Sequence, residues 1–294
     1  MSKIKNIILK IFRIIIPIKL IQKLYPQIYP QRFVYELNKI HDSRLLNKVI
    51  LVTGGGGSIG SAICYRVAIE GAKVAVAGRT LTTLNSTIDQ IIQAGVDRKN
   101  VIPIIMDITK DDSVEKGITE VVKIFGKLDV CINNAGGSAR DSVKPLEDQN
   151  LTVVEDIIDL NLIGTIRCCK YAITALKNSQ GKIINFGSTV GLNGQKLYSE
   201  YSASKSAIIG LTKSLALELG EFNINVNMVT PGWVWRNAFD GNQVRTSSKN
   251  ALLRYGYPEE VASLVAFLCS DESNYITGND FKIDGGRTLG LMKE

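Results

Sequence analysis

Histidine and paired cysteines are scarce in this chain of 294 residues. His41 is the only histidine and lies near the N-terminus, which excludes a histidine-based metal site and a Ser-His-Asp hydrolase, so we expect no metal. The cysteines are odd in number and form no CxxC pair, which argues against a disulfide framework. We interpret them as small apolar core residues of a protein in a reducing, cytoplasmic compartment. They are Cys64, Cys131, Cys168, Cys169 and Cys269.

Acidic residues are missing from the first 32 positions, which hold seven of the 35 Lys and Arg residues. Without these seven, the chain has 28 basic residues against 28 acidic ones, so the formal net charge of +7 belongs to the N-terminal segment. Nucleic-acid binding usually requires a strongly basic surface. The near-neutral main domain gives no indication of nucleic-acid binding.

The N-terminal segment has no hydrophobic run long enough to span a membrane. Residues 4–16 place isoleucines at helical spacing, but Lys10 and Arg13 interrupt them and Pro17 ends the helix. A cleavage site typical of secretion signals is also missing. Two interpretations stay open: a basic amphipathic helix over residues 4–16 that lies on an anionic membrane surface, or an isoleucine face that packs on the protein itself or on a subunit partner. We treat residues 1–47 as an N-terminal arm and connector.

From residue 48 to residue 294, short apolar runs alternate with longer helical stretches. Such alternation predicts parallel strands joined by crossover helices, and strands that are apolar at nearly every position indicate a sheet covered on both faces. We therefore expect an α/β fold: a single doubly wound domain of the Rossmann type with a mostly parallel seven-stranded sheet, preceded by the helical arm. The expected strands are Val49–Thr53, Lys73–Ala77, Val101–Met106, Leu128–Asn133, Lys182–Phe186, Asn225–Val229 and Asp280–Ile283. The expected helices are Ile59–Glu70, Leu81–Gln93, Asp111–Phe125, Val153–Leu176, Glu200–Leu219 and Pro258–Ser270.

The first expected strand runs into four consecutive glycines, and a helix follows them. Glycines let the backbone approach a pyrophosphate, and the free N–H groups at the helix end attract it. The order of strand, loop and helix therefore predicts a dinucleotide site formed by Gly54, Gly57, Ser58, Ile59 and Gly60.

The second expected strand ends without the carboxylate that would bind the adenine ribose of NAD. Arg79 stands there instead and is placed to bind a 2′-phosphate, because a guanidinium pairs with phosphate oxygens bidentately. An arginine here can also stack on adenine or stay solvated. We expect NADP to be favoured over NAD.

Further motifs follow in the second half of the chain: Asn133-Asn134-Ala135-Gly136, Ser188, Tyr201-Ser202-Ala203-Ser204-Lys205 and Pro231-Gly232. In order and spacing, these motifs resemble those of the short-chain dehydrogenase/reductase family. The resemblance extends from about residue 48 to residue 286 and fits the compact, single-domain branch of the family.

Tyr201 and Lys205 lie four positions apart, which places both side chains on one face of a helix. A nearby ammonium favours the phenolate and so lowers the pKa of a tyrosine. Such a phenol can donate a proton to a carbonyl oxygen that accepts hydride, or remove it in the reverse reaction. Ser188, at the end of the fifth expected strand, can hydrogen-bond the same oxygen. An inert Tyr–Lys pair on a helix surface is the alternative.

The resemblance implies further roles. Lys205 would also hold the nicotinamide ribose, and Asn161 would support a water-linked proton relay. For Asn161 and Asp107, local turn hydrogen bonds are the alternative. The remaining residues that the resemblance places around the cofactor are Asp107, Ile108, Asn133, Ala135, Gly136, Pro231, Gly232 and Val234.

Two positions depart from the compact branch. Ser58 stands where a second glycine is usual, and Gly57 instead fits the spacing of the nucleotide-sugar branch. Arg236 stands where a threonine is often found near the nicotinamide. The nucleotide-sugar branch usually adds a large C-terminal substrate domain, for which residues 233–294 leave little room.

Residues 233–255 would cover the substrate. This stretch contains two tryptophans and several basic residues. Two interpretations stay open: a solvated lid without specific contacts, or a lid that binds a phosphorylated, nucleotide-linked or carrier-linked substrate. We expect a reductase of a small carbonyl compound that forms a homodimer or homotetramer through Val153–Leu176 and Glu200–Leu219. The alternatives are a nucleotide-sugar epimerase or dehydratase with a tightly held NAD, and a non-catalytic cofactor-binding module.

Overall fold

The computed structural model describes residues 43–138, 143–236 and 250–290. The amphipathic helix expected over residues 4–16 lies outside the described residues. Within the described ranges, no helix is long and apolar enough to cross a bilayer. The cysteines are all free and buried, as expected from the sequence.

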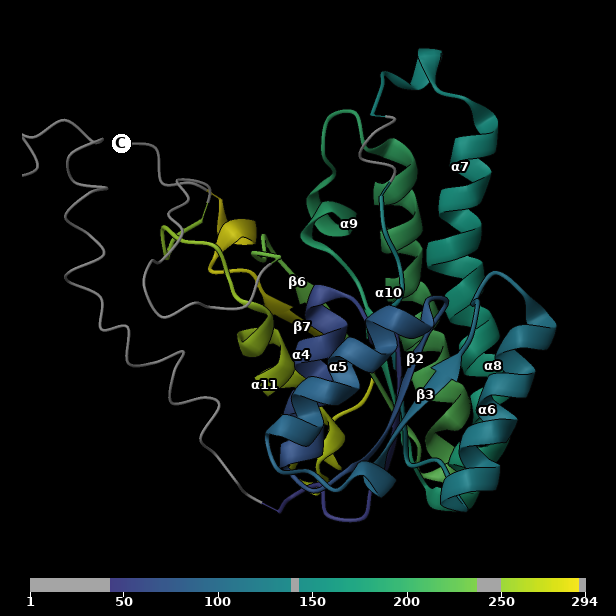
Figure 1. Ribbon diagram of the computed structural model, residues 1–294. Coiled ribbons are helices and arrows are strands. Elements are labelled where there is room, and N and C mark those ends of the chain that lie inside the picture. Colours follow the sequence, from purple (N-terminus) through teal and green to yellow (C-terminus); the bar gives the residue numbers. More distant parts are fainter. Residues whose placement is uncertain (1–42, 139–142, 237–249, 291–294) are drawn as a thin grey trace, which may run out of the picture.

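A single parallel sheet forms the centre of the domain, with its strands in the order β3-β2-β1-β4-β5-β6-β7 (Figure 1). All strands are parallel, but the order in which they are added reverses between β1 and β4. In such sheets, ligands bind in the crevice outside the carboxyl ends of the two strands at this reversal. This topology confirms the doubly wound Rossmann prediction. The strands are β1 (Val49–Thr53), β2 (Lys73–Gly78), β3 (Val101–Ile105), β4 (Val130–Asn133), β5 (Lys182–Phe186), β6 (Asn225–Pro231) and β7 (Asp280–Ile283).

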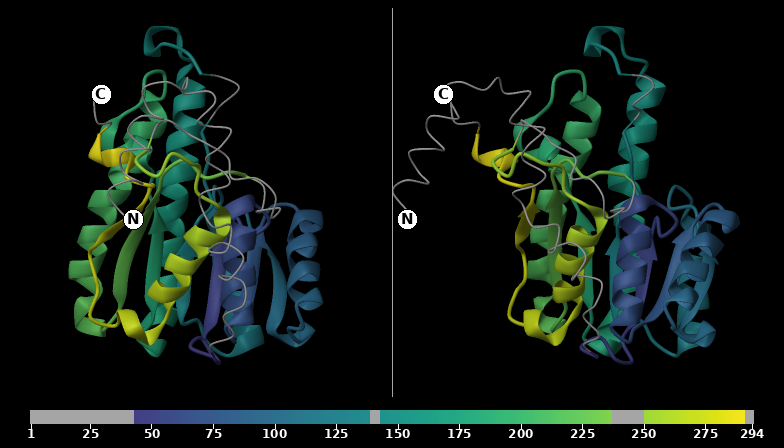
Figure 2. Two further views of the ribbon diagram at one scale, coloured as in Figure 1. Left: turned by 90° about the vertical axis from the view of Figure 1, so that its left-hand side faces the viewer. Right: turned by 60° about the vertical axis from the view of Figure 1, so that its left-hand side comes forward.

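Helices cover both faces of the sheet, as the views in Figures 1 and 2 show. Side chains of successive strand residues point to opposite faces. In β1, Ile50 and Val52 therefore join the core under α4, α5 and α11, whereas Val49 and Leu51 join the core under α6, α8 and α10. The helices are α4 (Ser58–Ile69), α5 (Leu81–Gln93), α6 (Asp111–Phe125), α7 (Leu151–Ile158), α8 (Gly164–Ser179), α9 (Thr189–Asn193), α10 (Ser199–Leu219) and α11 (Pro258–Cys269).

Two helical features differ from the sequence-based expectation. The helix expected over Val153–Leu176 begins at Leu151, contains a π-helical turn at Asp159–Ile163 between α7 and α8, and ends at Ser179. The five-residue helix α9 was not expected, because so short a segment has no readable periodicity. Both features lie beside the carboxyl edge of the sheet, where α7 and α10 rise above the strands (Figure 1).

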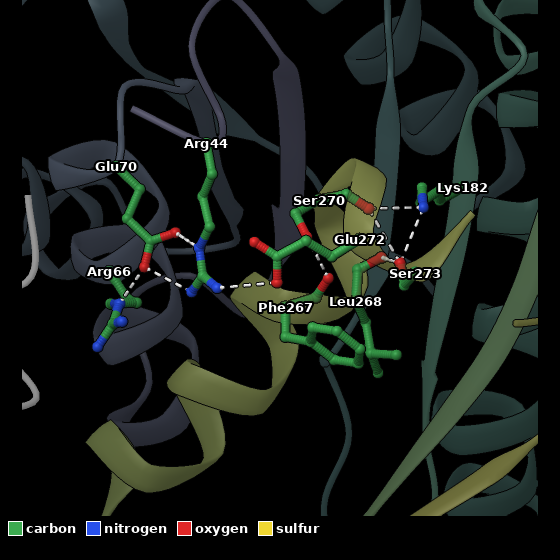
Figure 3. A network of polar contacts seen from close by, with 9 residues as sticks. All are labelled: Arg44, Arg66, Glu70, Lys182, Phe267, Leu268, Ser270, Glu272 and Ser273. Carbon is green, nitrogen blue, oxygen red and sulfur yellow. Dashed lines mark hydrogen bonds and ion pairs between the residues drawn. The ribbon is translucent and has the colours of Figure 1, made fainter. Parts of the chain in front are cut away.

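The amino edge of the sheet is held by a polar network (Figure 3). The carboxylate of Glu70, fully buried at the end of α4, accepts hydrogen bonds from Arg44 Nη2 at 2.9 Å and from Arg66 Nε. Nearby, Lys182 Nζ donates to the Ser270 carbonyl and to Ser273 Oγ, both at 2.8 Å. The chain thus enters the domain at the edge opposite the one where ligands bind.

Candidate active site

The glycine turn after β1 is shaped by close contact with the end of β4. Gly54 has φ +67°, and a Cβ built there would lie 3.0 Å from Ala135 Cα. Asn134 Nδ2 donates to the Thr53 carbonyl at 2.9 Å, and the Ala135 amide donates to Thr53 Oγ1 at 3.0 Å. A Cβ on Gly60 would lie only 2.1 Å from the Gly54 carbonyl oxygen. These contacts bring the turn, α4 and β4 together at the point where the topology predicts a ligand.

The amino end of α4 is chemically suited to a pyrophosphate. Its N-cap is Gly57, no side chain caps the helix, and its first turn contains no acidic residue. The hydroxyl oxygen of Ser58 is buried and has no hydrogen-bond partner among the described residues. A buried hydroxyl without a partner is unfavourable, whereas a phosphate oxygen would satisfy it. The residues present therefore fit a dinucleotide cofactor.

The expected adenine end lies after β2 and β3. Arg79 is exposed, and its charge reaches Asp107. Partial burial raises the pKa of the Asp107 carboxyl, but hydrogen bonds from Thr109 and the charge of Arg79 outweigh it, so that the pKa is held below its usual value. Asp107 Oδ1 accepts from the Thr109 amide at 3.0 Å, the local turn that the sequence left open. The side chain of Ile108 is buried against Gly164, and its carbonyl accepts from Arg167 Nη1 at 3.3 Å.

The side chain of Asn133 lies beneath the surface of the site and is buried in the protein interior. Its Nδ2 donates to Asn185 Oδ1 at 2.9 Å and to Cys169 Sγ at 3.2 Å. Asn185 Nδ2 in turn donates to Thr212 Oγ1 at 3.0 Å. This chain of amides links β4, β5 and α10, so the Asn133 side chain supports the floor of the site from below.

Gly136 brings two expected site residues together. A Cβ built on it would lie 2.5 Å from Asn161 Oδ1 and 3.3 Å from Lys205 Nζ. Asn161 is fully buried in the π turn, where its Oδ1 accepts from the Gly137 amide at 3.0 Å and its Nδ2 donates to the Gly137 carbonyl at 2.8 Å. Asn161 thus fixes the backbone that follows β4 beside the Lys205 ammonium.

Lys205 is buried on α10 and donates to the Phe186 carbonyl at 2.9 Å. Desolvation by burial lowers the pKa of Lys205 to about 8. Tyr201 lies four residues earlier on the same helix. Ser188 is the N-cap of α9 and accepts from the Val190 amide at 3.3 Å, which leaves its hydroxyl proton available to another acceptor.

A close helix contact places Ser188 relative to the tyrosine and lysine. A Cβ on Gly191, in α9, would lie 2.9 Å from Lys205 Cβ, so α9 rests directly on α10. The hydroxyl of Ser206 also donates to the Gly191 carbonyl. Gly191 could not be predicted from the sequence, because one glycine in a short helix gives no signal. Thr53 and Asn134 were not predicted as loop supports either, although Asn134 belongs to the Asn133-Asn134-Ala135-Gly136 motif.

The end of β6 leads into the stretch expected to cover the substrate. A Cβ on Gly232 would lie 2.7 Å from Asp284 Cα, so this stretch passes tightly over the end of β7. Val234 forms a parallel bridge with Gly256, and Pro231 is the last residue of β6. The middle of the expected lid, residues 237–249, lies outside the described residues.

Aromatic contacts fix the two described ends of this stretch. The rings of Trp233 and Tyr255 stack with centroids 5.8 Å apart, and Trp235 meets Tyr255 edge-on at 5.7 Å. Arg287 lies over the Trp233 ring at 4.2 Å. Among the described residues, no group of three or more His, Cys, Asp or Glu is arranged to hold a metal ion.

The parallel sheet, the glycine turn and the adjoining elements α9 and α10, which carry Ser188, Tyr201 and Lys205, are those of a nucleotide-dependent oxidoreductase. The chain belongs to the short-chain dehydrogenase/reductase family. Residues 55–288 match the family described as enoyl-(acyl carrier protein) reductase.

Relatives and solved structures agree with this assignment. The chain is 34% identical to the 3-oxoacyl-[acyl-carrier-protein] reductase of Thermotoga maritima, over 84% of this chain and all of that protein. It is 33% identical to the meso-2,3-butanediol dehydrogenase of Serratia marcescens, over 83% of this chain and 96% of that one. A short-chain dehydrogenase/reductase of unknown function from Caenorhabditis elegans, crystallised with cofactor, superposes with a TM-score of 0.78 at 30% identity, covering 85% of this chain and 98% of that one.

The protein is therefore an oxidoreductase that transfers hydride between a nicotinamide cofactor and a carbonyl or alcohol substrate. The spacing at Gly57 had fitted the nucleotide-sugar branch of the family. The matching family model and the relatives are instead reductases and dehydrogenases. The geometry explains the spacing: Gly57 has an ordinary φ of −90°, and a Cβ on it would meet only the Gly54 carbonyl at 3.3 Å. Gly57 is therefore not a glycine that the turn requires.

Proposed function

We propose that the protein reduces a small carbonyl compound with NADPH, and that Tyr201 supplies the proton. The observation that carries this proposal is that Asn161 and Lys205 converge at Gly136, beside the glycine turn. Lys205 lies on the same helix as Tyr201. A bound nicotinamide would supply the hydride. The remaining chemistry belongs to the side chains of this chain.

Each side chain has one task at the substrate oxygen. The Tyr201 phenol donates its proton to the oxygen, while the Ser188 hydroxyl donates a hydrogen bond that stabilises the developing charge. The Lys205 ammonium, close beneath, favours the phenolate that Tyr201 leaves behind. Asn161 orders the backbone at Gly137 and supports the return of a proton towards Lys205.

The glycine turn and the strand ends would hold the cofactor. Ser58 and the amide groups at the start of α4 bind the pyrophosphate, Arg79 binds the 2′-phosphate, and Lys205 binds the nicotinamide ribose. NADPH is preferred because β2 is followed by the guanidinium of Arg79 and not by a carboxylate. The full proposed set is Gly54, Gly57, Ser58, Ile59, Gly60, Arg79, Asp107, Ile108, Asn133, Ala135, Gly136, Tyr201, Lys205, Pro231, Gly232 and Val234.

Replacing Tyr201 tests the catalytic assignment. Tyr201→Phe should lower kcat by about 10²- to 10⁴-fold, because the proton donor is lost, while the Kd for NADPH stays unchanged. Tyr198→Phe is the matched control: the same atom is removed three residues earlier, where no lysine follows at the fourth position. Turnover retained by Tyr201→Phe would remove Tyr201 from the mechanism.

Titration with both cofactors tests the cofactor assignment. The wild type should bind NADPH more tightly than NADH, and Arg79→Ala should weaken binding of NADPH while leaving that of NADH nearly unchanged. Equal affinities in the wild type would remove Arg79 from the phosphate site. Stoichiometric NAD retained through purification, without net NADPH consumption, would instead favour an epimerase or dehydratase.

The charge of the substrate is a further part of the proposal. A phosphorylated or carrier-linked substrate is supported by the reductase relatives that act on acyl-carrier-protein substrates and by exposed Lys144, Lys196 and Arg236. A panel of phosphorylated ketoses, acyl thioesters and uncharged ketones would rank these classes by kcat/KM. A higher kcat/KM for uncharged ketones would contradict an anionic substrate.

Two proposals concern assembly. Exposed Leu151, Ile166 and Leu217 on α7, α8 and α10 support a homodimer or homotetramer through these helices, which light scattering would test.

We also propose that residues 4–16 bind anionic membranes. Sedimentation with anionic liposomes, with and without residues 1–24, would test this second proposal, and no shift on truncation would contradict it.

A further inference from the structure

Arg167, on α8, joins three other segments of the chain through one side chain. Its Nε donates to Asp111 Oδ1 at 2.6 Å. Its Nη1 donates to Asp159 Oδ1 at 2.9 Å and to the Ile108 carbonyl at 3.3 Å. These partners lie at the start of α6, at the start of the π turn and in the loop after β3. A guanidinium is suited to several acceptors at once, because its planar group has five N–H donors in fixed directions.

The start of α8 is packed tightly against the loop after β3. A Cβ built on Gly164, the first residue of α8, would lie 2.8 Å from Ile108 Cδ1 and 3.2 Å from the Ile108 carbonyl oxygen. The side chain of Arg167 is only 18% exposed. Little room is therefore left for the loop to move independently of α8, and the Arg167 bonds are partly shielded from water.

The carboxylate that Arg167 meets on α6 is held in its charged form. The hydrogen bond from Arg167 lowers the pKa of the Asp111 carboxyl, and the Tyr171 hydroxyl, which donates at 3.2 Å, lowers it further. These effects outweigh the slight desolvation, so the pKa of Asp111 lies below its usual value. Arg167 and Tyr171 are four residues apart on α8 and therefore reach Asp111 from one face of the helix.

Two of the three segments that Arg167 joins belong to the proposed site. The loop with Ile108 lies at the expected adenine end of the cofactor site. Asp159 begins the π turn, and Asn161 in this turn bonds both the amide and the carbonyl of Gly137. One guanidinium thus bonds the loop at the adenine end and the turn that contains the buried amide.

We propose that Arg167 is a positioning residue that holds Asn161 in place from the adenine end of the cofactor site. This assignment rests on the proposed function, in which Asn161 supports the proton relay and the Ile108 loop binds the cofactor. Without the guanidinium, the π turn loses its bond at Asp159, and the loop loses its bond at the Ile108 carbonyl. The first loss should lower kcat through Asn161, because small displacements of catalytic groups are costly. The second should weaken NADPH binding.

Substitutions at Arg167 and Asp159 separate the two effects in the full-length protein. Arg167→Met removes all three bonds, so kcat should fall at least about tenfold and the Kd for NADPH should rise at least about threefold. Asp159→Ala removes only the bond to the π turn, so kcat should fall while the Kd stays within about twofold of the wild type. Asp159→Asn keeps an acceptor oxygen and should retain most of the wild-type kcat. Steady-state oxidation of NADPH and fluorescence titration, below the Tm of each variant, would measure kcat and Kd.

A double-mutant cycle shows whether Arg167 acts through Asn161. Asn161→Ala alone should lower kcat, and adding Arg167→Met should then lower kcat by less than about twofold more. The rise in the Kd for NADPH should persist in the double variant, because it comes from the loop and not from the π turn. A merely structural role of Arg167 would instead lower kcat by the same factor with and without Asn161.

Lys116→Met is the matched control. It breaks an exposed ion pair with Asp112 on α6, next to Asp111, and leaves the loop and the π turn untouched, so kcat and Kd should equal those of the wild type. Wild-type kcat in Arg167→Met or in Asp159→Ala, or independent losses in the cycle, would overturn the role of Arg167. If Asn161→Ala does not fold, the contrast between Asp159→Ala and Asp159→Asn decides, and equal kcat in these two variants would overturn it.

The wild type tests the proposed function separately. Reduction of a carbonyl compound that is lost in Tyr201→Phe leaves the proposed function intact even when the Arg167 variants behave like the wild type. Failure of the wild type to reduce any carbonyl compound would contradict the proposed function itself, and the role of Arg167 with it.

Discussion

At the residue scale, Gly136 is the position at which a change in packing should affect activity most directly. Gly136→Ala should displace Asn161, because its Cβ would lie 2.5 Å from Asn161 Oδ1. We expect a loss of stability of about 1–3 kcal/mol from overpacking and a fall in kcat of at least about tenfold from the displaced amide. Urea unfolding and steady-state kinetics would measure both.

The control for this substitution is the next residue. A Cβ on Gly137 would meet nothing within 4 Å, so Gly137→Ala should change kcat and stability little. Equal effects of the two substitutions would show that the loop, and not the contact with Asn161, controls activity.

Burial of Lys205 makes the stability of the cofactor-free protein depend on pH. The pKa of Lys205 falls from 10.5 to about 8 on folding, so between these values the unfolded chain binds more protons than the folded one. The free energy of unfolding therefore rises with pH in this window, and below pH 8 the penalty is full and constant. Relative to Lys205→Met, the wild type should gain roughly 2–3 kcal/mol between pH 8 and pH 10.

Urea unfolding of both proteins across this range would measure that difference, in which other titrating groups cancel. A difference that stays constant with pH would contradict a lowered pKa for Lys205.

The sequence predicted residue identities better than side-chain environments. Ser188, Tyr201 and Lys205 could be proposed because their chemistry follows from residue type and spacing. The amide network of Asn133 and the crowding at Gly136 depend on contacts between β4, β5, α8 and α10, which no local pattern encodes.

At the element scale, the turn between β1 and α4 distinguishes a required glycine from a permitted one. Gly60→Ala should disrupt the turn, because its Cβ would lie 2.1 Å from the Gly54 carbonyl oxygen. We expect NADPH affinity to fall by at least about tenfold, as the phosphate-binding backbone moves away. Gly57→Ala should stay within about threefold of the wild type, because its Cβ faces only one contact at 3.3 Å. Calorimetric titration would measure both affinities, and similar losses would contradict the distinction.

Strands and helices followed from the sequence almost residue for residue where burial has a clear period. β1, β5, β7, α5 and α6 have the expected bounds. The largest disagreements are the π turn at Asp159–Ile163 and the short helix α9. Smaller ones are shifted ends, such as β4 beginning at Val130 instead of Leu128 and α8 ending at Ser179 instead of Leu176. In the π turn, the Asn161 side chain bonds the Gly137 carbonyl, a tertiary contact that a local sequence pattern does not encode.

At the scale of the whole molecule, the two edges of the sheet have separate tasks. The carboxyl edge contains the glycine turn and the buried, unpaired hydroxyl of Ser58, features that suit the binding of a ligand. The amino edge contains the ion pairs in Figure 3, of which those of Glu70 with Arg44 and Arg66 join the segment before β1 to α4, while Arg44 also reaches the exposed Glu272 after α11. Loss of stability at the amino edge should therefore leave the chemistry at the carboxyl edge unchanged.

Glu70→Gln tests this separation. The substitution removes the negative charge between Arg44 and Arg66, of which Arg66 is only 4% exposed. Breaking a buried ion pair costs about 3–5 kcal/mol, which lowers Tm by on the order of 10 °C in a domain of this size. Glu272→Gln should change Tm little, because its carboxylate is 58% exposed and 3.7 Å from Arg44. Both variants should keep the kcat of the wild type at 25 °C; a lower kcat in Glu70→Gln would show that α4 transmits strain from one edge to the other.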